Sequence, residues 1–263
     1  RRGDCPLRLE LRGLCKTFPD GTRGLDGASL VLETPSFTVL SGRNGSGKSL
    51  LIRHALGLER ADEGSILADG EALETAMAVT RRRVALVFQE PEHQILGVTV
   101  REDAEFGPRA AGERPAGYSA RVDAALTAAG LAGFGNRLCA GLSGGEKRRL
   151  AVASALVSGP ELIILDEPFN GLDWAGASDL LDVLLRLRDA GVGVLVVTHD
   201  LEKCLAHADR LVVMAAGRVV RDGSPADLWD ELPELGLRRP AGGPERLAEM
   251  SWLAETKPLE AAR

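Results

Sequence analysis

One loop limits the possible folds of this chain more than any other feature. Residues Gly42–Ser49 (GRNGSGKS) fit the pattern G-x-x-x-x-G-K-[ST] without a gap. They follow an apolar run, Phe37–Leu40, and precede a stretch with helical character, Leu50–Leu58. A glycine-rich backbone can turn its N–H groups around a triphosphate, and the following helix directs the positive end of its dipole at the phosphates. The loop therefore predicts a strand–loop–helix unit that binds phosphate, with Lys48 at the β- and γ-phosphates and Ser49 at Mg²⁺.

Short apolar runs recur along the chain and indicate an α/β fold. The first segment alternates, with Leu7, Leu9 and Leu11 separated by charged residues, as in a strand with one buried face. Later runs are continuous, which is typical of strands that are buried on both faces. These runs are Val84–Phe88, Leu162–Leu165, Val192–Thr198 and Leu211–Ala215, with helical stretches between them. We therefore expect a parallel or mixed β-sheet flanked by helices.

The composition changes twice along the chain. From Thr99 to Leu142 it is rich in alanine and glycine and poor in β-branched residues, which favours a small helical insert. Glu146–Val157 then repeats apolar residues at helical spacing. Beyond Asp222 proline, glutamate and arginine are frequent and the periodicity is weak, so we expect a C-terminal extension of short helices.

Composition argues against several other classes of protein. The 263 residues carry a net charge of -6, whereas proteins that bind nucleic acid usually have a basic excess, so no nucleic-acid partner is expected. The four cysteines are far apart and form no C-x-x-C pair, as in a reducing compartment. No apolar run approaches the ~18–20 residues that span a bilayer, and we recognise no signal peptide at the start. Any role at a membrane would then come through a partner.

A second candidate element ends in two carboxylates. The run Leu162–Leu165 is followed by Asp166 and Glu167, and buried strands deliver their C-terminal residues to the crevice where α/β sheets bind ligands. A strand that ends in acids is often only a solvated turn, but behind a phosphate loop the pair has a chemical use. Asp166 could hold Mg²⁺ through water, and Glu167 could accept a proton from the water that attacks a γ-phosphate.

A third motif precedes the strong helix. Ser143 is followed by two glycines and Glu146, and serine at this position is a good N-cap. The glycines would let a phosphate approach the first N–H groups of the helix, although a capped helix behind a flexible loop would look the same. Together with the phosphate loop and the acidic strand, this LSGGE segment resembles the ABC ATPase family, and the resemblance runs from about Leu7 to Gly223.

The resemblance extends to further positions in the order that the family has them. Phe18 is similar to the aromatic residue that stacks on adenine, and Gln89 to the glutamine that senses Mg²⁺ and water. Gly171–Asp173 is similar to the end of the D-loop, and His199 to the switch histidine at the γ-phosphate. Taken alone, Phe18 could be a core residue, and a histidine at the end of an apolar strand is usually structural. The order of all the motifs favours the family roles.

The resemblance also implies which residues hold ATP and Mg²⁺. The expected catalytic residues are Glu167, His199 and Gln89, and the expected Mg²⁺ residues are Ser49, Gln89 and Asp166. One subunit would hold ATP with Phe18, Asn44, Gly45, Ser46, Gly47, Lys48, Ser49 and Leu50, and a second ATPase subunit, identical or related, with Ser143 and Gly145. Two departures from the family are Leu50, where many members have threonine, and Phe169–Asn170, where smaller residues are usual.

The segment after Gln89 resembles one branch of the family, the energy-coupling-factor ATPases, which include cobalt and nickel types. The runs FQEPEHQ from Phe88, REDAEFGP from Arg101 and LGL from Leu235 carry this resemblance. It implies a peripheral subunit at the cytoplasmic face of the cell membrane, bound to an integral membrane coupling subunit, that drives import of a vitamin or a transition-metal ion. Glu92 is a candidate to pair with an arginine of that membrane partner, or else a solvated acid on a loop.

The alternatives are an ABC ATPase of another importer class, which lacks the resemblance after Gln89, and a non-transport ABC ATPase, which fits the sequence less well. Members that act in DNA repair interrupt the domain with heptad coiled coils or zinc modules, and translation factors normally carry two such domains on one chain. A non-catalytic scaffold would have no need of Glu167. We therefore expect a P-loop NTPase of the ABC type over residues 5–225, with a mixed sheet, a small helical subdomain at about 98–145, and an extension over 226–263.

Overall fold

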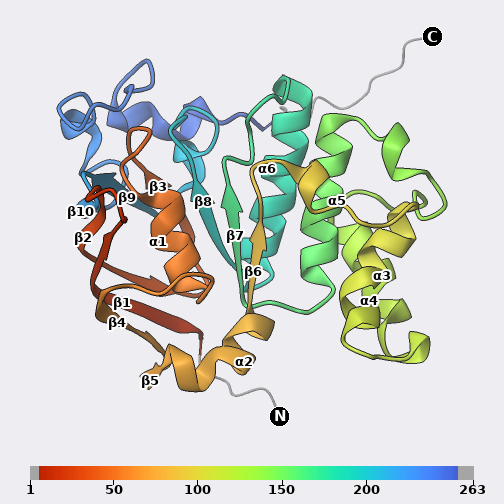
Figure 1. The fold of residues 1–263 in the computed structure, drawn as a ribbon. Helices are drawn as coiled ribbons and strands as arrows, with labels where there is room; N and C mark the ends of the chain where they lie inside the picture. Colours follow the sequence, from red (N-terminus) through yellow and green to blue (C-terminus); the bar gives the residue numbers. More distant parts are fainter. Residues whose placement is uncertain (1–5, 254–263) are drawn as a thin grey trace, which may run out of the picture.

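The computed structural model describes residues 6–253, in which two β-sheets and six α-helices are arranged in layers (Figure 1). The strands are β1 (Arg8–Thr17), β2 (Arg23–Glu33), β3 (Phe37–Ser41), β4 (Glu63–Ala68), β5 (Glu71–Ala72), β6 (Val84–Val87), β7 (Leu162–Asp166), β8 (Gly193–Val197), β9 (Arg210–Ala215) and β10 (Arg218–Gly223). The helices are α1 (Lys48–Ala55), α2 (Leu73–Arg83), α3 (Val100–Ala110), α4 (Pro115–Ala128), α5 (Gly144–Leu156) and α6 (Trp174–Asp189).

The larger sheet positions the phosphate loop and the two acids. Its strands lie in the order β10-β9-β3-β8-β7-β6, and all its pairs are parallel except that of β10 with β9. The central strands β3 and β8 are buried along their whole length, as their continuous apolar sequences predict. The expected mixed sheet is therefore confirmed. The boundaries differ slightly from the expected ones, since β6 ends at Val87 and α1 begins at Lys48 and ends at Ala55.

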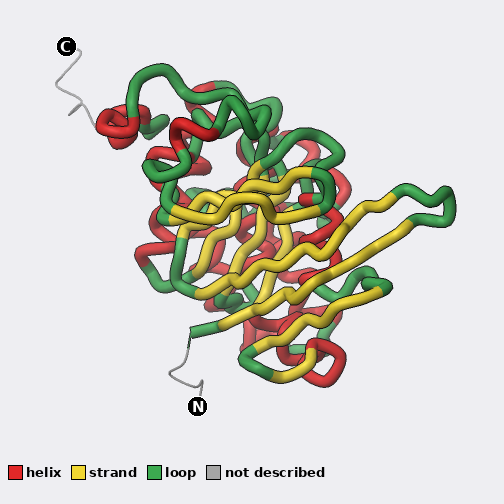
Figure 2. Tube along the Cα trace, turned by 90° about the vertical axis from the view of Figure 1, so that its left-hand side faces the viewer, coloured by secondary structure: helices red, strands yellow, loops and turns green. Residues whose placement is uncertain are grey.

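The smaller sheet is antiparallel, in the order β2-β1-β4-β5, and only its first strand was expected (Figure 2). Leu9 and Leu11 of β1 are buried, as their alternation predicts. Most of β4 is exposed or half-buried, so its sequence carries no apolar pattern from which a strand could be inferred. Between the sheets lies α1, whose Leu51 and Ile52 share a core with β1 and with one face of the larger sheet.

The opposite face of the larger sheet is covered by α6 and by the chain that follows β10. Leu180 and Leu184 of α6 pack against Ile163 and Val196 of the sheet, and Trp229 joins the same core. Beyond β10 the described chain forms only short 3₁₀ turns, among them η4 (Trp229–Glu231) and η5 (Pro244–Met250). Residue 5, where the expected domain begins, and residues 254–263 of the expected extension lie outside the described residues.

Three helices between β6 and β7 have a hydrophobic core of their own. Val100 of α3, Tyr118 and Val122 of α4 and Leu150 of α5 are buried in it. Thr99 caps α3 through a capping box with Glu102, and so fixes where the helix begins. This separate core agrees with the helical insert expected from the composition, while the exact domain limits stay a prediction.

Candidate nucleotide-binding and hydrolysis site

The phosphate loop connects β3 to α1 as the sequence predicts. All three of its glycines have backbone angles that residues with side chains rarely adopt, φ 149° at Gly42, 78° at Gly45 and 100° at Gly47. A Cβ atom at Gly42 would lie 2.3 Å from the carbonyl oxygen of Met214, so a larger residue cannot be placed there without a shift of β9. At Gly42 and Gly47 the fold therefore has room for the backbone alone, which lets the loop turn tightly and present backbone N–H groups to a ligand.

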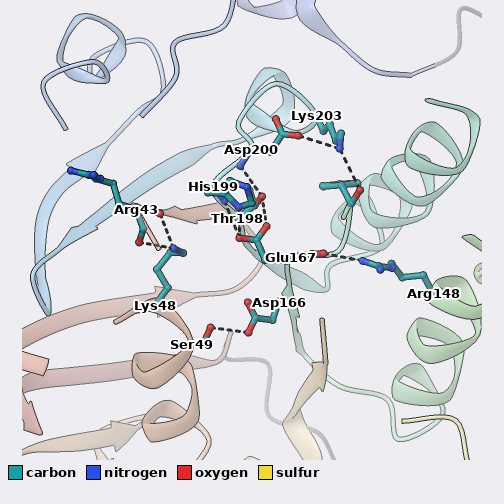
Figure 3. Close-up of polar contacts among 12 residues, drawn as sticks. Arg43, Lys48, Ser49, Arg148, Asp166, Glu167, Thr198, His199, Asp200 and Lys203 are labelled. Carbon is teal, nitrogen blue, oxygen red and sulfur yellow. Dashed lines mark hydrogen bonds and ion pairs between the residues drawn. The ribbon is translucent and has the colours of Figure 1, made fainter. Parts of the chain in front are cut away.

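Lys48 begins α1 and lies almost buried under this loop, with 7% of its surface exposed. Its Nζ donates to the carbonyl oxygens of Gly42, at 2.7 Å, and Arg43, at 3.2 Å (Figure 3). Burial lowers the pKa of Lys48, and the nearby carboxylates of Glu167 and Asp166 oppose that shift. In the same loop the buried hydroxyl of Ser46 has no hydrogen-bond partner within residues 6–253. A lysine held by carbonyls alone and a hydroxyl without a partner both suit a phosphate ligand.

Asp166 ends β7 opposite the first turn of α1. The hydroxyl of Ser49 donates to its Oδ2 at 2.9 Å (Figure 3). Burial raises the pKa of Asp166, and the charge of Glu167 raises it further. Burial and the like charge of Glu167 thus both disfavour the ionised form of Asp166. The Asp166 carboxylate and the Ser49 hydroxyl are hard oxygen ligands of the kind that Mg²⁺ prefers. These two residues therefore fit the metal that the sequence predicts.

Glu167 is presented to the cleft by a turn with left-handed backbone geometry, φ 45°, which is unusual for a residue other than glycine. Its carboxylate is almost buried and accepts three hydrogen bonds (Figure 3). The donors are Thr198 Oγ1 at 2.9 Å, the backbone N–H of His199 at 3.2 Å and His199 Nδ1 at 2.7 Å. Because a carboxylate can only accept, Nδ1 carries the proton in this contact. Thr198 was not predicted from the sequence, although a threonine that ends a buried strand just before His199 was a usable signal.

One cleft of about 550 Å³ brings most of the predicted residues together. Phe18 lies on its wall and is 39% exposed, so the alternative interpretation of Phe18 as a core residue is wrong. Leu50 and Phe18 flank Gly24, which shows that the two side chains are neighbours. Asn170 also lines the cleft and was predicted only as a departure from the family. The predicted residues on its wall are Phe18, Asn44, Gly45, Ser46, Gly47, Lys48, Ser49, Leu50, Gln89, Asp166, Glu167 and His199.

Ser143 and Gly145 do not belong to this cleft. They line a different one, of about 410 Å³, together with Gly171 and Asp173. Ser143 is the N-cap of α5, as predicted, and forms a capping box with Glu146. Asp173 likewise caps α6 by accepting from the N–H of Gly176 at 2.8 Å. The subunit thus presents two separate clefts at helix starts: Asp166 and Glu167 line the one beside the phosphate loop, whereas Glu146 and Asp173 in the other are engaged in capping α5 and α6.

The segment after Gln89 lies beside an apolar groove. This groove has a volume of about 310 Å³ and is lined mainly by Leu56, Leu58, Leu86 and Phe88, and the side chains of Leu58 and Phe88 are exposed. Glu92 is exposed and pairs with Lys147 of α5 at 3.2 Å, so it already has a partner within its own subunit.

A phosphate loop between a buried strand and a helix, with two carboxylates at the end of a parallel strand beside it, defines a P-loop nucleoside triphosphatase. The family model described as ABC transporter matches residues 25–170. The energy-coupling factor transporter ATP-binding protein of Methanocaldococcus jannaschii is 37% identical over 86% of this chain and 82% of its own length. The cobalt import ATP-binding protein of Rhodobacter capsulatus is 39% identical over 88% of this chain and 85% of its own.

A solved structure leads to the same assignment. The structure of CbiO1 from Clostridium perfringens, described as part of the transporter complex CbiONQ, superposes with a TM-score of 0.79 at 30% identity and covers 88% of this chain and 94% of that one. The chain belongs to the ABC transporter family. Its relatives lie in the branch of energy-coupling-factor and cobalt-import ATP-binding subunits, as the sequence predicted, and it is an ATPase whose hydrolysis is coupled to transport.

Proposed function

We propose that this chain hydrolyses Mg-ATP in the cleft between β3 and β7 and that two ATPase subunits close around two ATP molecules to drive import through a membrane partner. The observation that carries the proposal is the position of the Glu167 carboxylate. It lies in the same cleft as Lys48 and Asp166, and three hydrogen bonds from Thr198 and His199 hold it in place.

Each residue of the cleft then has a part in hydrolysis. The phosphates would replace the two carbonyls as partners of Lys48, with the loop N–H groups around them. Ser49 and Asp166, with Gln89 nearby, would hold Mg²⁺, which neutralises charge on the β- and γ-phosphates. Glu167 takes the proton of the attacking water. His199 donates through Nδ1 to Glu167, and its cationic form, in which both ring nitrogens are donors, would also donate through Nε2 to a γ-phosphate oxygen.

The second cleft explains why two subunits are needed. The α5 helix start with Ser143 and Gly145 offers N–H groups to an anion but lies outside the cleft that holds Lys48. In a head-to-tail pair, each of these helix starts would meet the ATP held by the other subunit. Closure of the pair would then depend on bound ATP, and hydrolysis would allow the two subunits to separate.

The apolar groove beside Gln89 is the surface on which we place the membrane partner. Phe88 and Leu58 are exposed along it, and a short amphipathic helix of an integral membrane coupling subunit would bury them. Within the described part of the chain, no helix has both the length and the apolar character that crossing a membrane requires. The likeness to energy-coupling-factor subunits supports a place at the cytoplasmic face of the cell membrane, with a vitamin or a transition-metal ion as the imported substrate. The relative named for cobalt import supports the metal-ion class.

Phosphate release from the purified protein tests the hydrolytic part. Lys48→Ala and Glu167→Gln should each lower the rate by at least about a hundredfold, because each removes a group that acts on the transferred phosphate or on the attacking water. Asp182→Asn, which removes an exposed carboxylate of α6 that pairs with Arg186, is the matched control and should leave the rate unchanged. A wild-type rate for Glu167→Gln would refute the assignment of Glu167.

Mixed dimers test the sharing of sites between subunits. Gly145→Asp places a carboxylate where a phosphate should bind, and the fold has room for it, because an added Cβ would lie 3.6 Å from the Cα of Gly176. Lys48→Ala and Gly145→Asp should each be inactive alone. Mixed in equal amounts, they should recover about a quarter of the wild-type rate, since half of the dimers are mixed and each of these has one intact site. Absence of any recovery, with mixed dimers shown to form, would contradict shared sites.

A further inference from the structure

Arg148 connects the helix that starts at the signature residues to the turn that carries Glu167. It lies in the second turn of α5 and is 7% exposed. Its Nη1 donates to two successive carbonyl oxygens, that of Glu167 at 2.9 Å and that of Pro168 at 2.6 Å. Figure 3 shows the side chain reaching from α5 to this turn.

The burial of this guanidinium is costly and is not offset by a direct ion pair. Among residues 6–253 its hydrogen bonds go to carbonyls, and its Nε is buried without a partner. Burial lowers the pKa of Arg148, and the charge of Glu92 compensates in part. Glu92 is itself paired with Lys147. A buried charge whose main partners are two carbonyls of one turn points to a role at that turn.

The turn needs support because its geometry is strained. Glu167 has φ 45°, a conformation that costs a residue with a side chain about 1 kcal/mol or more, and such conformations persist only where surrounding contacts fix them. On the side of the sheet, the N–H of Glu167 donates to Val197 at 2.8 Å. On the opposite side, the two bonds from Arg148 hold the carbonyls of Glu167 and Pro168.

We propose that Arg148 is a positioning residue for ATP hydrolysis, which holds the left-handed turn so that the Glu167 carboxylate faces the γ-phosphate. Since Arg148 and the signature residues Ser143 and Gly145 lie on the same helix start, a movement of α5 on engaging the partner's ATP reaches Glu167 through this side chain. The inference rests on the proposed role of Glu167 as the group that accepts the proton.

Steady-state hydrolysis separates positioning from a structural role. Arg148→Gln keeps one donor nitrogen but loses the positive charge and the length of the guanidinium side chain. We therefore expect kcat to fall at least about tenfold while KM for ATP stays within about twofold. Arg148→Lys, which retains the charge on a single donor atom, should give an intermediate kcat. The control is Arg186→Gln, which removes an exposed arginine of α6 paired with Asp182 and should behave as wild type.

A double-mutant cycle shows whether Arg148 acts through Glu167. In the Glu167→Gln background, adding Arg148→Gln should lower the residual rate by less than about twofold, because the group that Arg148 positions is already lost. A full tenfold loss in that background, or a wild-type kcat for Arg148→Gln alone, would overturn the inference. If Arg148→Gln does not bind a fluorescent ATP analogue with Mg²⁺ and is therefore misfolded, Arg148→Lys decides, and a wild-type kcat for it overturns the inference. Wild-type hydrolysis by Glu167→Gln would instead refute the proposed function itself.

Discussion

Replacing Thr198 by valine should both destabilise the fold and slow hydrolysis. Valine keeps the shape of the side chain, which is 2% exposed, but removes the hydroxyl that donates to Glu167 at 2.9 Å and accepts from the N–H of Asp200 at 3.0 Å. A hydrogen bond to a charged group contributes about 1.5–3 kcal/mol, and water can replace the contact at Asp200, which is only half-buried. We therefore expect a loss of about 2 kcal/mol in the free energy of unfolding.

The fall in kcat should be smaller than the factor that corresponds to the whole loss of about 2 kcal/mol. Two hydrogen bonds from His199 still hold the carboxylate, so we expect kcat to fall about tenfold, where the full 2 kcal/mol would give about thirtyfold. Urea denaturation of the nucleotide-free protein and phosphate release at saturating Mg-ATP measure the two effects. The control is Thr38→Val on the neighbouring strand β3, which loses only a neutral hydrogen bond to Ser36, about 1 kcal/mol, and should keep its rate. If Thr198→Val matched Thr38→Val in both stability and rate, Thr198 would not be holding Glu167.

Three further predictions concern charges outside that contact. Asp166→Asn should raise the melting temperature of the nucleotide-free protein by a few degrees, because it removes a buried charge beside Glu167, while Mg²⁺-dependent hydrolysis is largely lost. Burial and the charge of Arg188 lower the pKa of His207, so the unfolded chain binds a proton there first and stability is lost as the pH falls below about 6.5. His207→Gln, which can still bond to Ser251, should therefore reduce the difference in stability between pH 7.5 and 5.5 in urea titrations. Glu92→Ala should uncouple transport in membranes but leave basal hydrolysis largely intact, and unaltered uptake would count against a role at the membrane partner.

The sequence predicts the parts of the fold whose patterns are dictated by burial or by chemistry. The continuous apolar strands β3, β7 and β8 could be located because both of their faces are covered. The phosphate loop could be placed between a strand and a helix because phosphate binding by this motif uses the start of the helix that follows it. The N-cap at Ser143 could be predicted because a serine stands directly before a stretch of helical periodicity.

What the sequence could not predict depends on contacts between distant segments. The strand β4 is mostly exposed and pairs with β1 through its backbone, so its side chains carry no sign of the sheet. The bond from Thr198 to Glu167 joins residues 31 positions apart, so the sequence can mark Thr198 as a polar end of an apolar run but cannot identify its partner. The same holds for Arg148, since a cation in the second turn of a helix is usually solvated and its burial appears only when α5 packs beside the turn after β7.

The charges of the cleft explain why its most costly groups are retained. Without ligand, one buried cation, Lys48, faces two carboxylates, and burial disfavours the charged forms of both Lys48 and Asp166. In the proposed roles, Mg²⁺ would relieve the excess of negative charge at Asp166 and phosphate oxygens would give Lys48 partners of opposite charge, so binding of Mg-ATP would offset both penalties. We therefore expect nucleotide to stabilise the protein, and the groups whose burial is unfavourable would be those that provide affinity and hydrolysis. A variant that neutralised Asp166 should therefore gain stability and lose Mg²⁺-dependent hydrolysis together.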